Sequence, residues 1–306
     1  MLDLAFGELP NALHPVAWLG RLIAWGMERA PRAGHGRQLA YGAGLTLAVV
    51  GIGGGGAHAL YRIAGRVPGG RLVVGALLVK CSLSVRMLAA EARRVERSLR
   101  DGDEAGAREA LRSLVSRDTS GLGEALLAAA AIESVAENAS DSVVAPLLYH
   151  LALGPAGAFA YRAANTLDSM VGYHGRYEYL GKVAARVDDV LNLAPSRLTA
   201  LLMVGAALPA GLNPRESWRI TMRDHDRTES PNAGWPMAAM AGALGRRLEK
   251  VDHYALGEGP LPRAADIDRS IRLLTAALAL GGLALLAGLF GARRVQGAGM
   301  ARRASV

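Results

Sequence analysis

The sequence is poor in the residues and motifs that define several common protein classes. It contains one cysteine, Cys81, which excludes an intramolecular disulfide framework and any CxxC metal site. Aromatic residues make up only 5%, and no Lys/Arg run is interleaved with them, so nucleic acid is not an expected partner. Walker A, GxSxG and HExxH patterns are absent. The start, MLDLAFGELPNALHP, lacks a basic region followed by an apolar core, so we expect no cleavable signal peptide.

Apolar residues, glycine and positive charge are present in excess. Hydrophobic residues make up 51%, and the mean hydropathy is +0.19. The 38 glycines, with abundant alanine, favour the close helix–helix approach of membrane bundles. Lys and Arg number 35 against 27 Asp and Glu, a formal net charge of +8. Without a nucleic-acid signal, this excess favours lipid headgroups or phosphorylated ligands as partners.

Long uncharged stretches predict membrane-spanning helices. Residues 38–61 contain no Asp, Glu, Lys or Arg, and neither do residues 273–292. Each stretch reaches the ~20 residues that a helix needs to cross a bilayer. Residues 142–161 are also uncharged, but Pro146, Gly154 and Pro155 interrupt them. A broken helix at membrane depth is tolerated where it lines a cavity. We therefore predict an all-α polytopic membrane helical bundle with broken or re-entrant helices.

A charged segment interrupts this apolar pattern. Residues 91–118, EARRVERSLRDGDEAGAREALRSLVSRD, have heptad-like Leu and Val and a turn signal at Gly102 and Asp103. They predict a solvated, aqueous helical hairpin. We expect the hairpin to be an insertion within one polytopic domain that spans residues 1–306.

An acidic stripe follows the hairpin. Glu133, Glu137 and Asp141 recur every four residues, so a helix places them on one face, where they repel one another. One interpretation is functional, with hard oxygen ligands holding Mg²⁺ through waters and positioning ATP phosphates. The alternative is a buried network in which the stripe pairs with arginines such as Arg117, Arg162 or Arg186.

Further polar clusters lie in otherwise apolar sequence. Asn165 and Thr166 are expected at a helix start, where either can act as the N-cap, with Asp168 following. Asp188 can bind metal or pair with a neighbouring arginine. Residues 230–234, SPNAG, predict a turn whose backbone N–H groups can cradle an anion; an ordinary capped loop is the alternative.

Four long motifs resemble one family. ESVAENASDSVVAPLLY, YRAANTLDSMVGY, ARVDDVLNLAPSRLTAL and SPNAGWPMAAMAGAL occur in the order found in the membrane-bound adenosylcobinamide-phosphate synthases of cobalamin biosynthesis. The resemblance implies an ATP- and Mg²⁺-dependent ligase. It would join 1-aminopropan-2-ol, or its O-phosphate, to the carboxylate of adenosylcobyric acid, a corrinoid. It also implies a prokaryotic inner membrane, an active site facing the cytoplasm, lipid contact, and other corrinoid-pathway membrane enzymes as candidate partners.

On this basis we assign roles to the polar residues. The catalytic candidates are Glu133, Glu137 and Asp168. The metal-ligand candidates are Glu133, Glu137, Asp141 and Asp188. The substrate-binding candidates are Arg117, Asn138, Asn165, Arg223, His225, Ser230 and Asn232. Two other functions would use similar residues: a membrane transporter for a corrinoid or another small molecule, and a non-catalytic membrane scaffold for corrinoid enzymes.

Overall fold

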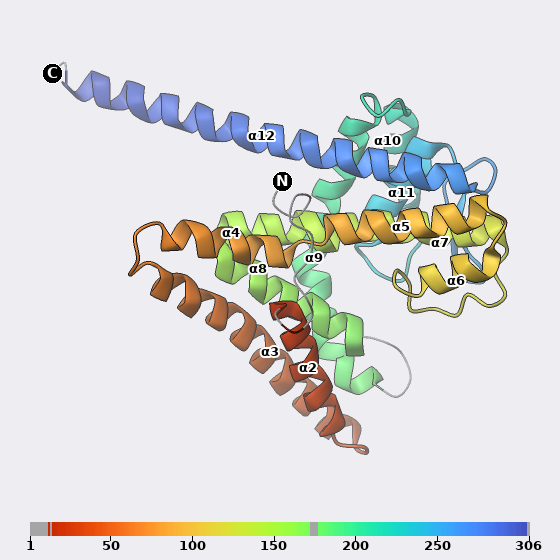
Figure 1. Cartoon of the computed structure of the whole chain (residues 1–306), viewed down its shortest axis with the longest axis horizontal. Coiled ribbons are helices and arrows are strands. Elements are labelled where there is room, and N and C mark those ends of the chain that lie inside the picture. Colours follow the sequence, from red (N-terminus) through yellow and green to blue (C-terminus); the bar gives the residue numbers. More distant parts are fainter. Residues whose placement is uncertain (1–11, 13, 172–176, 305–306) are drawn as a thin grey trace.

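The computed structural model describes residue 12, residues 14–171 and residues 177–304, the last range with side chains as far as residue 287. This part of the chain is helical apart from one short hairpin and the connecting loops (Figure 1). The elements are α2 (Pro15–Glu28), α3 (His35–Ala64), α4 (Gly70–Ser82), α5 (Val85–Arg100), α6 (Glu104–Leu111), α7 (Glu124–Ala139), η1 (Ser140–Val144), α8 (Ala145–Val171), α9 (Glu178–Ala207), α10 (Pro214–Asp224), α11 (Gly234–Leu244), β1 (Leu248–Lys250), β2 (Tyr254–Leu256) and α12 (Ala264–Ala304).

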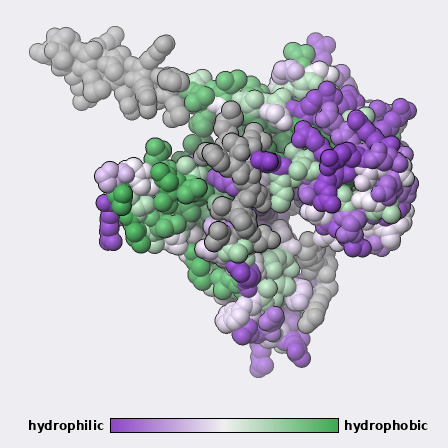
Figure 2. Space-filling model, in the orientation of Figure 1, coloured by the Kyte–Doolittle hydropathy of each residue, from purple (hydrophilic) through white to green (hydrophobic). Residues whose placement is uncertain are grey.

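Five helical segments are long and apolar enough to cross a membrane. They are His35–Ala64, Gly70–Arg100, Glu124–Val171, Glu178–Ala207 and Ala264–Ala287. The predicted span 38–61 lies within α3, and the predicted span 273–292 lies in the middle of α12. Figure 2 shows hydrophobic surface over α4 and the middle of α12, whereas hydrophilic residues cover the end that holds α6 and the close of α5. The chain is therefore a multi-pass, all-α membrane protein.

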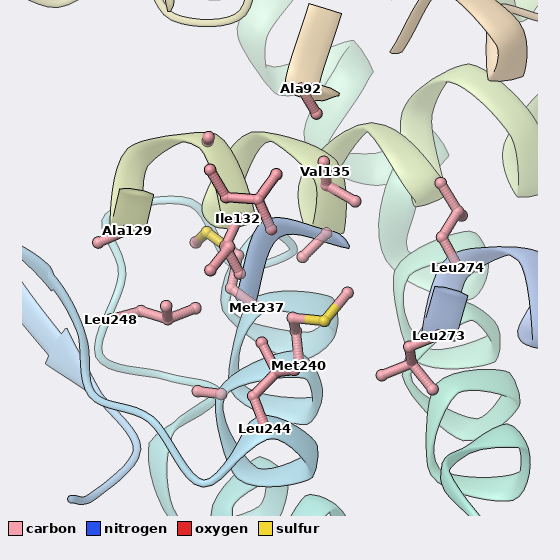
Figure 3. Packing of buried hydrophobic residues seen from close by; sticks show 14 of the residues in the cluster. Ala92, Ala129, Ile132, Val135, Met237, Met240, Leu244, Leu248, Leu273 and Leu274 are labelled. Carbon is pink, nitrogen blue, oxygen red and sulfur yellow. The ribbon is translucent and has the colours of Figure 1, made fainter. Parts of the chain in front are cut away.

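Two hydrophobic cores hold the helices together. The α3–α8 core takes buried residues from α2, α3, α4, α8 and the start of α9. The α7–α11 core takes them from α5, α6, α7, α10, α11, the hairpin, α12 and the end of α9. In Figure 3 its side chains come together from several elements, among them Ile132 of α7, Met237 of α11 and Leu248 of β1. Because α9 contributes to both cores, its middle lies at the boundary between them.

Glycine allows α3 to approach its neighbours closely. A Cβ atom at Gly42 would overlap the carbonyl oxygen of Leu180 in α9, and one at Gly53 would lie 2.9 Å from the Cβ of Ala163 in α8. Gly55 has no such neighbour. Among the consecutive glycines 53–56, close packing is therefore confined to the face of α3 that is turned toward α8.

The break predicted in residues 142–161 has two parts. Helix α7 passes into the five-residue π-helix η1, and α8 is then interrupted at Gly154, whose φ is +70°. Helix α9 carries a different irregularity, since Pro195 has no N–H to donate to the carbonyl of Leu191. The hydroxyl of Tyr149 donates to that carbonyl instead, at 2.9 Å. This bond ties α8 to α9 beside their polar residues.

The charged segment 91–118 contains α6 and most of α5, joined by a turn at Gly102, whose φ is +72°. Helix α5 begins earlier, at Val85, and packs against α6, α7 and α12. The β1–β2 hairpin was not expected from the sequence.

A polar cavity between the two cores

A cavity of about 890 Å³ opens between the two cores. Its walls come from α5, the α6–α7 loop, α7, η1, α8, α9, the loop before α11, and the hairpin. We call it the central cavity. It is lined by every predicted site residue except Arg223 and His225. Those lining residues are Arg117, Glu133, Glu137, Asn138, Asp141, Asn165, Asp168, Asp188, Ser230 and Asn232.

The acidic stripe enters the central cavity from α7 and η1. Glu133 is buried, whereas Glu137, one turn later, is exposed to the cavity. The side chain of Glu137 makes no hydrogen bond or ion pair with any residue that the structure describes. Asp141 lies on η1, and π-helical turns of this kind are frequent at functional sites. The three carboxylates share one wall, but their surroundings differ.

For Glu133 the structure shows the second interpretation of the stripe, in which the carboxylate pairs with an arginine. Its Oε2 atom lies 2.8 Å from a guanidinium nitrogen of Arg117, and the two side chains are 6% and 22% exposed. The other carboxylate oxygen, Oε1, is buried without a hydrogen-bond partner among the described residues. A carboxylate already neutralised by arginine is a weaker candidate for a metal ligand than an unpaired one. Glu133 is thus placed to orient Arg117.

Asn165 links two acidic residues from different helices. Its amide nitrogen lies 3.3 Å from Asp141 Oδ2 and 3.2 Å from Asp188 Oδ1. Asp188 Oδ2 in turn accepts a hydrogen bond from Asn192 at 2.9 Å. The hydroxyl of Tyr161 donates to Asn192 at 2.9 Å. These amides hold the carboxylates of η1 and α9 on one side of the cavity without adding positive charge.

The expectation of a helix start at Asn165 and Thr166 is wrong. Both residues lie inside α8, where the hydroxyl of Thr166 donates to the carbonyl of Arg162 at 2.7 Å, as a helical Thr does. Continuation of the helix places Asp168 one turn after Asn165, on the cavity wall. Its Oδ1 atom is buried and has no hydrogen-bond partner among the described residues. It is an acceptor available to a bound group.

Arg223 and His225 lie away from the central cavity. Arg223 pairs with the buried Asp224 at 2.7 Å and also contacts Glu258. His225 stacks on Trp235 with ring centroids 4.1 Å apart. Burial alone would raise the pKa of Asp224, but hydrogen bonds from Arg223 and from the Gly257 N–H outweigh it and lower that pKa. This cluster fixes α10 against the segment after the hairpin.

The SPNAG segment forms a turn at the cavity edge. The hydroxyl of Ser230 accepts from the backbone N–H groups of Asn232 and Ala233, both at 3.3 Å. These two groups are therefore engaged within the turn, which favours the capped loop over the predicted anion cradle. Asn232 donates to the carbonyl of Asp189 at 2.7 Å. Its Oδ1 accepts from Arg197 at 3.0 Å, so the turn is tied to α9.

Asn138 is largely satisfied within its own helix. Its amide nitrogen donates to the carbonyl of Ser134 at 3.0 Å, and its amide oxygen accepts from the hydroxyl of Ser142 at 3.1 Å. Ser142 also accepts from Arg162 at 3.1 Å. Asn138 thus connects α7 to a cavity arginine through a serine.

Several residues that line the central cavity were not among the site residues predicted from the sequence. Arg94 and Arg112 come from the charged hairpin, and Lys250 and Tyr254 come from the β-hairpin. Tyr254 lies beside Glu133, and burial, followed by the charge of that carboxylate, raises the pKa of its hydroxyl. The signal that could have revealed the last two is the alternation in LEKVDHYAL, which is typical of a short hairpin.

The donor set suits a hard cation, although the carboxylates do not enclose one. Within the described residues, no three His, Cys, Asp or Glu side chains lie close enough to hold a metal ion by themselves. Mg²⁺ usually takes one or two carboxylates and completes its shell with water and phosphate oxygens. The unpartnered Oδ1 of Asp168, near the Asp141–Asn165–Asp188 cluster, fits this pattern.

Known proteins that resemble this chain are named for one pathway. The family model described as "CobD/Cbib protein" matches residues 1–277. The chain is 46% identical over 269 residues to a cobalamin biosynthesis protein CobD of Dehalococcoides mccartyi, covering 86% of this chain and 85% of that protein. It is 44% identical over 259 residues to a probable CobD of Methanothermobacter thermautotrophicus, covering 84% of each. It is 40% identical over 300 residues to a CbiB of Salmonella typhi, covering 92% of this chain and 93% of that protein. No solved structure matches it.

Proposed function

This chain belongs to the CobD/CbiB family and has a role in cobalamin biosynthesis, and on that premise we propose that it is an ATP-dependent amide ligase. It joins 1-aminopropan-2-ol, or its O-phosphate, to the carboxylate of adenosylcobyric acid. The single observation that carries the proposal is the central cavity, in which arginines and unpaired carboxylates face one space between membrane helices.

Such a reaction needs groups of both charges. A carboxylate is a poor electrophile, so one of its oxygens must first displace ADP from the γ-phosphorus of ATP. The amine then attacks the carbonyl carbon, and phosphate leaves with that oxygen. Anionic oxygens require cationic partners in the first step, and the ammonium must lose its proton before the second. Arg117 and Arg162 suit the first requirement and the cavity carboxylates suit the second.

We assign the proton transfer to Glu137. Its carboxylate faces the cavity and has no partner among the described residues, so it is free to accept a proton from an ammonium. Glu133 acts differently, because its ion pair holds the guanidinium of Arg117 toward the cavity. Asp168, or one carboxylate of the adjacent Asp141–Asp188 pair together with it, would supply the one or two protein ligands of an Mg²⁺ ion that shields the charge of the nucleotide phosphates. Arg186 is set apart from this machinery, since it pairs with Asp189 at 3.5 Å on an exposed face.

The setting of the cavity suits an activated intermediate. The two hydrophobic cores on either side limit the approach of water to an acyl phosphate. A volume of about 890 Å³ is near the upper end for a pocket that encloses one drug-sized ligand. A corrinoid and ATP together exceed one such ligand. We propose that the reactive carboxylate arm enters the cavity while the corrin ring remains at its mouth.

The proposal extends to cellular location. We propose that the protein resides in a prokaryotic inner membrane with the cavity accessible from the cytoplasm, where ATP is available. Its partners would be the corrinoid, the amine, ATP, membrane lipid, and other membrane enzymes of the corrinoid pathway.

The test separates a ligase from a transporter and from a scaffold. Purified protein in lipid nanodiscs receives ATP, Mg²⁺, adenosylcobyric acid and either amine, and mass spectrometry detects the product. The proposal predicts a new amide that requires ATP and is lost in Glu137→Gln. Corrinoid flux in sealed vesicles without covalent product would favour the transporter. Neither flux nor product, in a folded protein, would favour the scaffold.

A further inference from the structure

The β1–β2 hairpin presents one of its faces to the central cavity. Leu248 pairs with Leu256 and Lys250 pairs with Tyr254 in the antiparallel register. Side chains alternate between the faces of a strand, so these four residues share one face. Leu248 and Leu256 are fully buried, and Lys250 and Tyr254 line the cavity. The opposite face carries Glu249, which pairs with Arg247 at 3.1 Å.

The base of the hairpin is firmly anchored. Leu248 packs into the α7–α11 core near Met237 (Figure 3). The N–H of Gly257, directly after β2, donates to the carboxylate of Asp224 at 2.8 Å. Gly257 has φ +81°, and a Cβ atom there would overlap the carbonyl oxygen of Arg246. Because both ends of the hairpin are held, the positions of Lys250 and Tyr254 are set by the fold.

Lys250 differs from the other cations of the central cavity. Arg94 pairs with Glu91 at 2.9 Å, Arg112 with Glu109 at 3.0 Å and Arg117 with Glu133 at 2.8 Å. Arg162 donates to Ser142. The side chain of Lys250 is half-buried yet makes no hydrogen bond or ion pair with any described residue, and the carboxylate of Glu137 is a charged neighbour in the same cavity. Partial burial of an unpaired ammonium is costly, so its position favours an anionic ligand.

We propose that Lys250 binds a phosphate oxygen of a substrate in the central cavity. A lysine ammonium is a compact point charge and a common phosphate ligand. The nearby carboxylates would hold the cation that accompanies such a phosphate, which accounts for positive and negative side chains facing one another across the cavity. Tyr254, the strand partner of Lys250, lines the same cavity beside Glu133.

The phosphate belongs either to the nucleotide or to the phosphorylated amine. This inference rests on the proposed ligase function for the identity of these ligands, but binding can be measured without turnover. Calorimetry would titrate ATP with Mg²⁺, and separately 1-aminopropan-2-ol O-phosphate, into wild type, Lys250→Ala and Lys250→Arg. The matched control is Lys182→Ala, because Lys182 is an exposed lysine of α9 outside the central cavity.

Loss of a charge-assisted hydrogen bond predicts that Lys250→Ala raises the Kd of one of the two ligands by about 10- to 100-fold. Lys250→Arg should recover part of the affinity, and Lys182→Ala should bind both ligands with the affinity of the wild type. All four proteins should have the same thermal unfolding midpoint. The ligand that weakens identifies the source of the phosphate. Unchanged affinity of Lys250→Ala for both ligands would overturn the inference, even if the wild type makes the amide. A selective loss of affinity would support it, even if no amide forms.

Discussion

Glu133 and Glu137 are one helical turn apart, yet the same substitution at each should have opposite consequences. Glu133→Gln preserves size but removes the charge opposite Arg117. Breaking a buried ion pair costs ~3–5 kcal/mol. Glu133 is 6% exposed and Arg117 is 22% exposed to the cavity, so we expect the lower end of that range. A loss of about 3 kcal/mol lowers the unfolding midpoint of a protein of this size by about 5 °C.

Glu137→Gln should leave stability almost unchanged. The carboxylate of Glu137 faces the cavity, has no hydrogen bond or ion pair to a described residue, and is repelled by Asp188. Its substitution should change the free energy of unfolding by no more than about 0.5 kcal/mol. If it accepts the amine proton, amide formation should fall by about 10²- to 10⁴-fold.

The assay combines fluorescence-detected unfolding in detergent with mass spectrometry of the corrinoid product. Each glutamine variant serves as the control for the other, because both positions lie on α7 and both changes remove one carboxylate. Equal destabilisation of the two variants would refute the distinction between a paired and a free carboxylate. Normal turnover by Glu137→Gln would refute its role as proton acceptor.

Three further predictions concern packing, metal and pH. Gly42→Ala should destabilise by about 1–3 kcal/mol because its Cβ atom would overlap α9, whereas Gly55→Ala should gain up to ~1 kcal/mol, as measured by thermal unfolding. ATP with Mg²⁺ at a hundredfold excess over Kd should stabilise the wild type by ~2.7 kcal/mol, and Asp168→Asn should lose most of this effect in the same assay. Asp224 has a lowered folded-state pKa, so its stabilisation is present above about pH 4 and is lost as pH falls further. The midpoint difference between wild type and Asp224→Asn should therefore be full at pH 7 and shrink below pH 4.

The apolar spans were predictable because their signal is local. An uncharged stretch of membrane length, as in residues 38–61, needs no tertiary information to be recognised as helical. Gly154 and Pro155 likewise indicate, from the sequence alone, the break in α8. The π-helix at η1 was not predictable, since nothing in SDSVV distinguishes it from an α-helical segment. The β-hairpin was missed because three-residue strands carry too little periodicity to compete with a helical background.

The site was predictable in its residue types more than in its pairings. Charge in apolar sequence identified Glu137, Asp168 and Asp188 before any fold was known, and all three line the central cavity. The partner of Glu133 depended on how the α6–α7 loop folds back, which sequence spacing does not specify. Arg223 is the converse case, because the structure places it in an ion-pair network outside the cavity, which its position in the sequence does not specify.

The central claim is that ATP activates the corrinoid carboxylate within this cavity, and an isotope experiment tests it directly. Adenosylcobyric acid labelled with ¹⁸O in its reactive carboxylate is incubated with ATP, Mg²⁺ and the amine, and the phosphate products are analysed by mass spectrometry. Activation requires one carboxylate oxygen to leave with the γ-phosphorus, so the account predicts one ¹⁸O in inorganic phosphate for each amide formed. The label should disappear from phosphate in Glu137→Gln, in step with the loss of amide. Amide formation that leaves no ¹⁸O in phosphate would contradict the account.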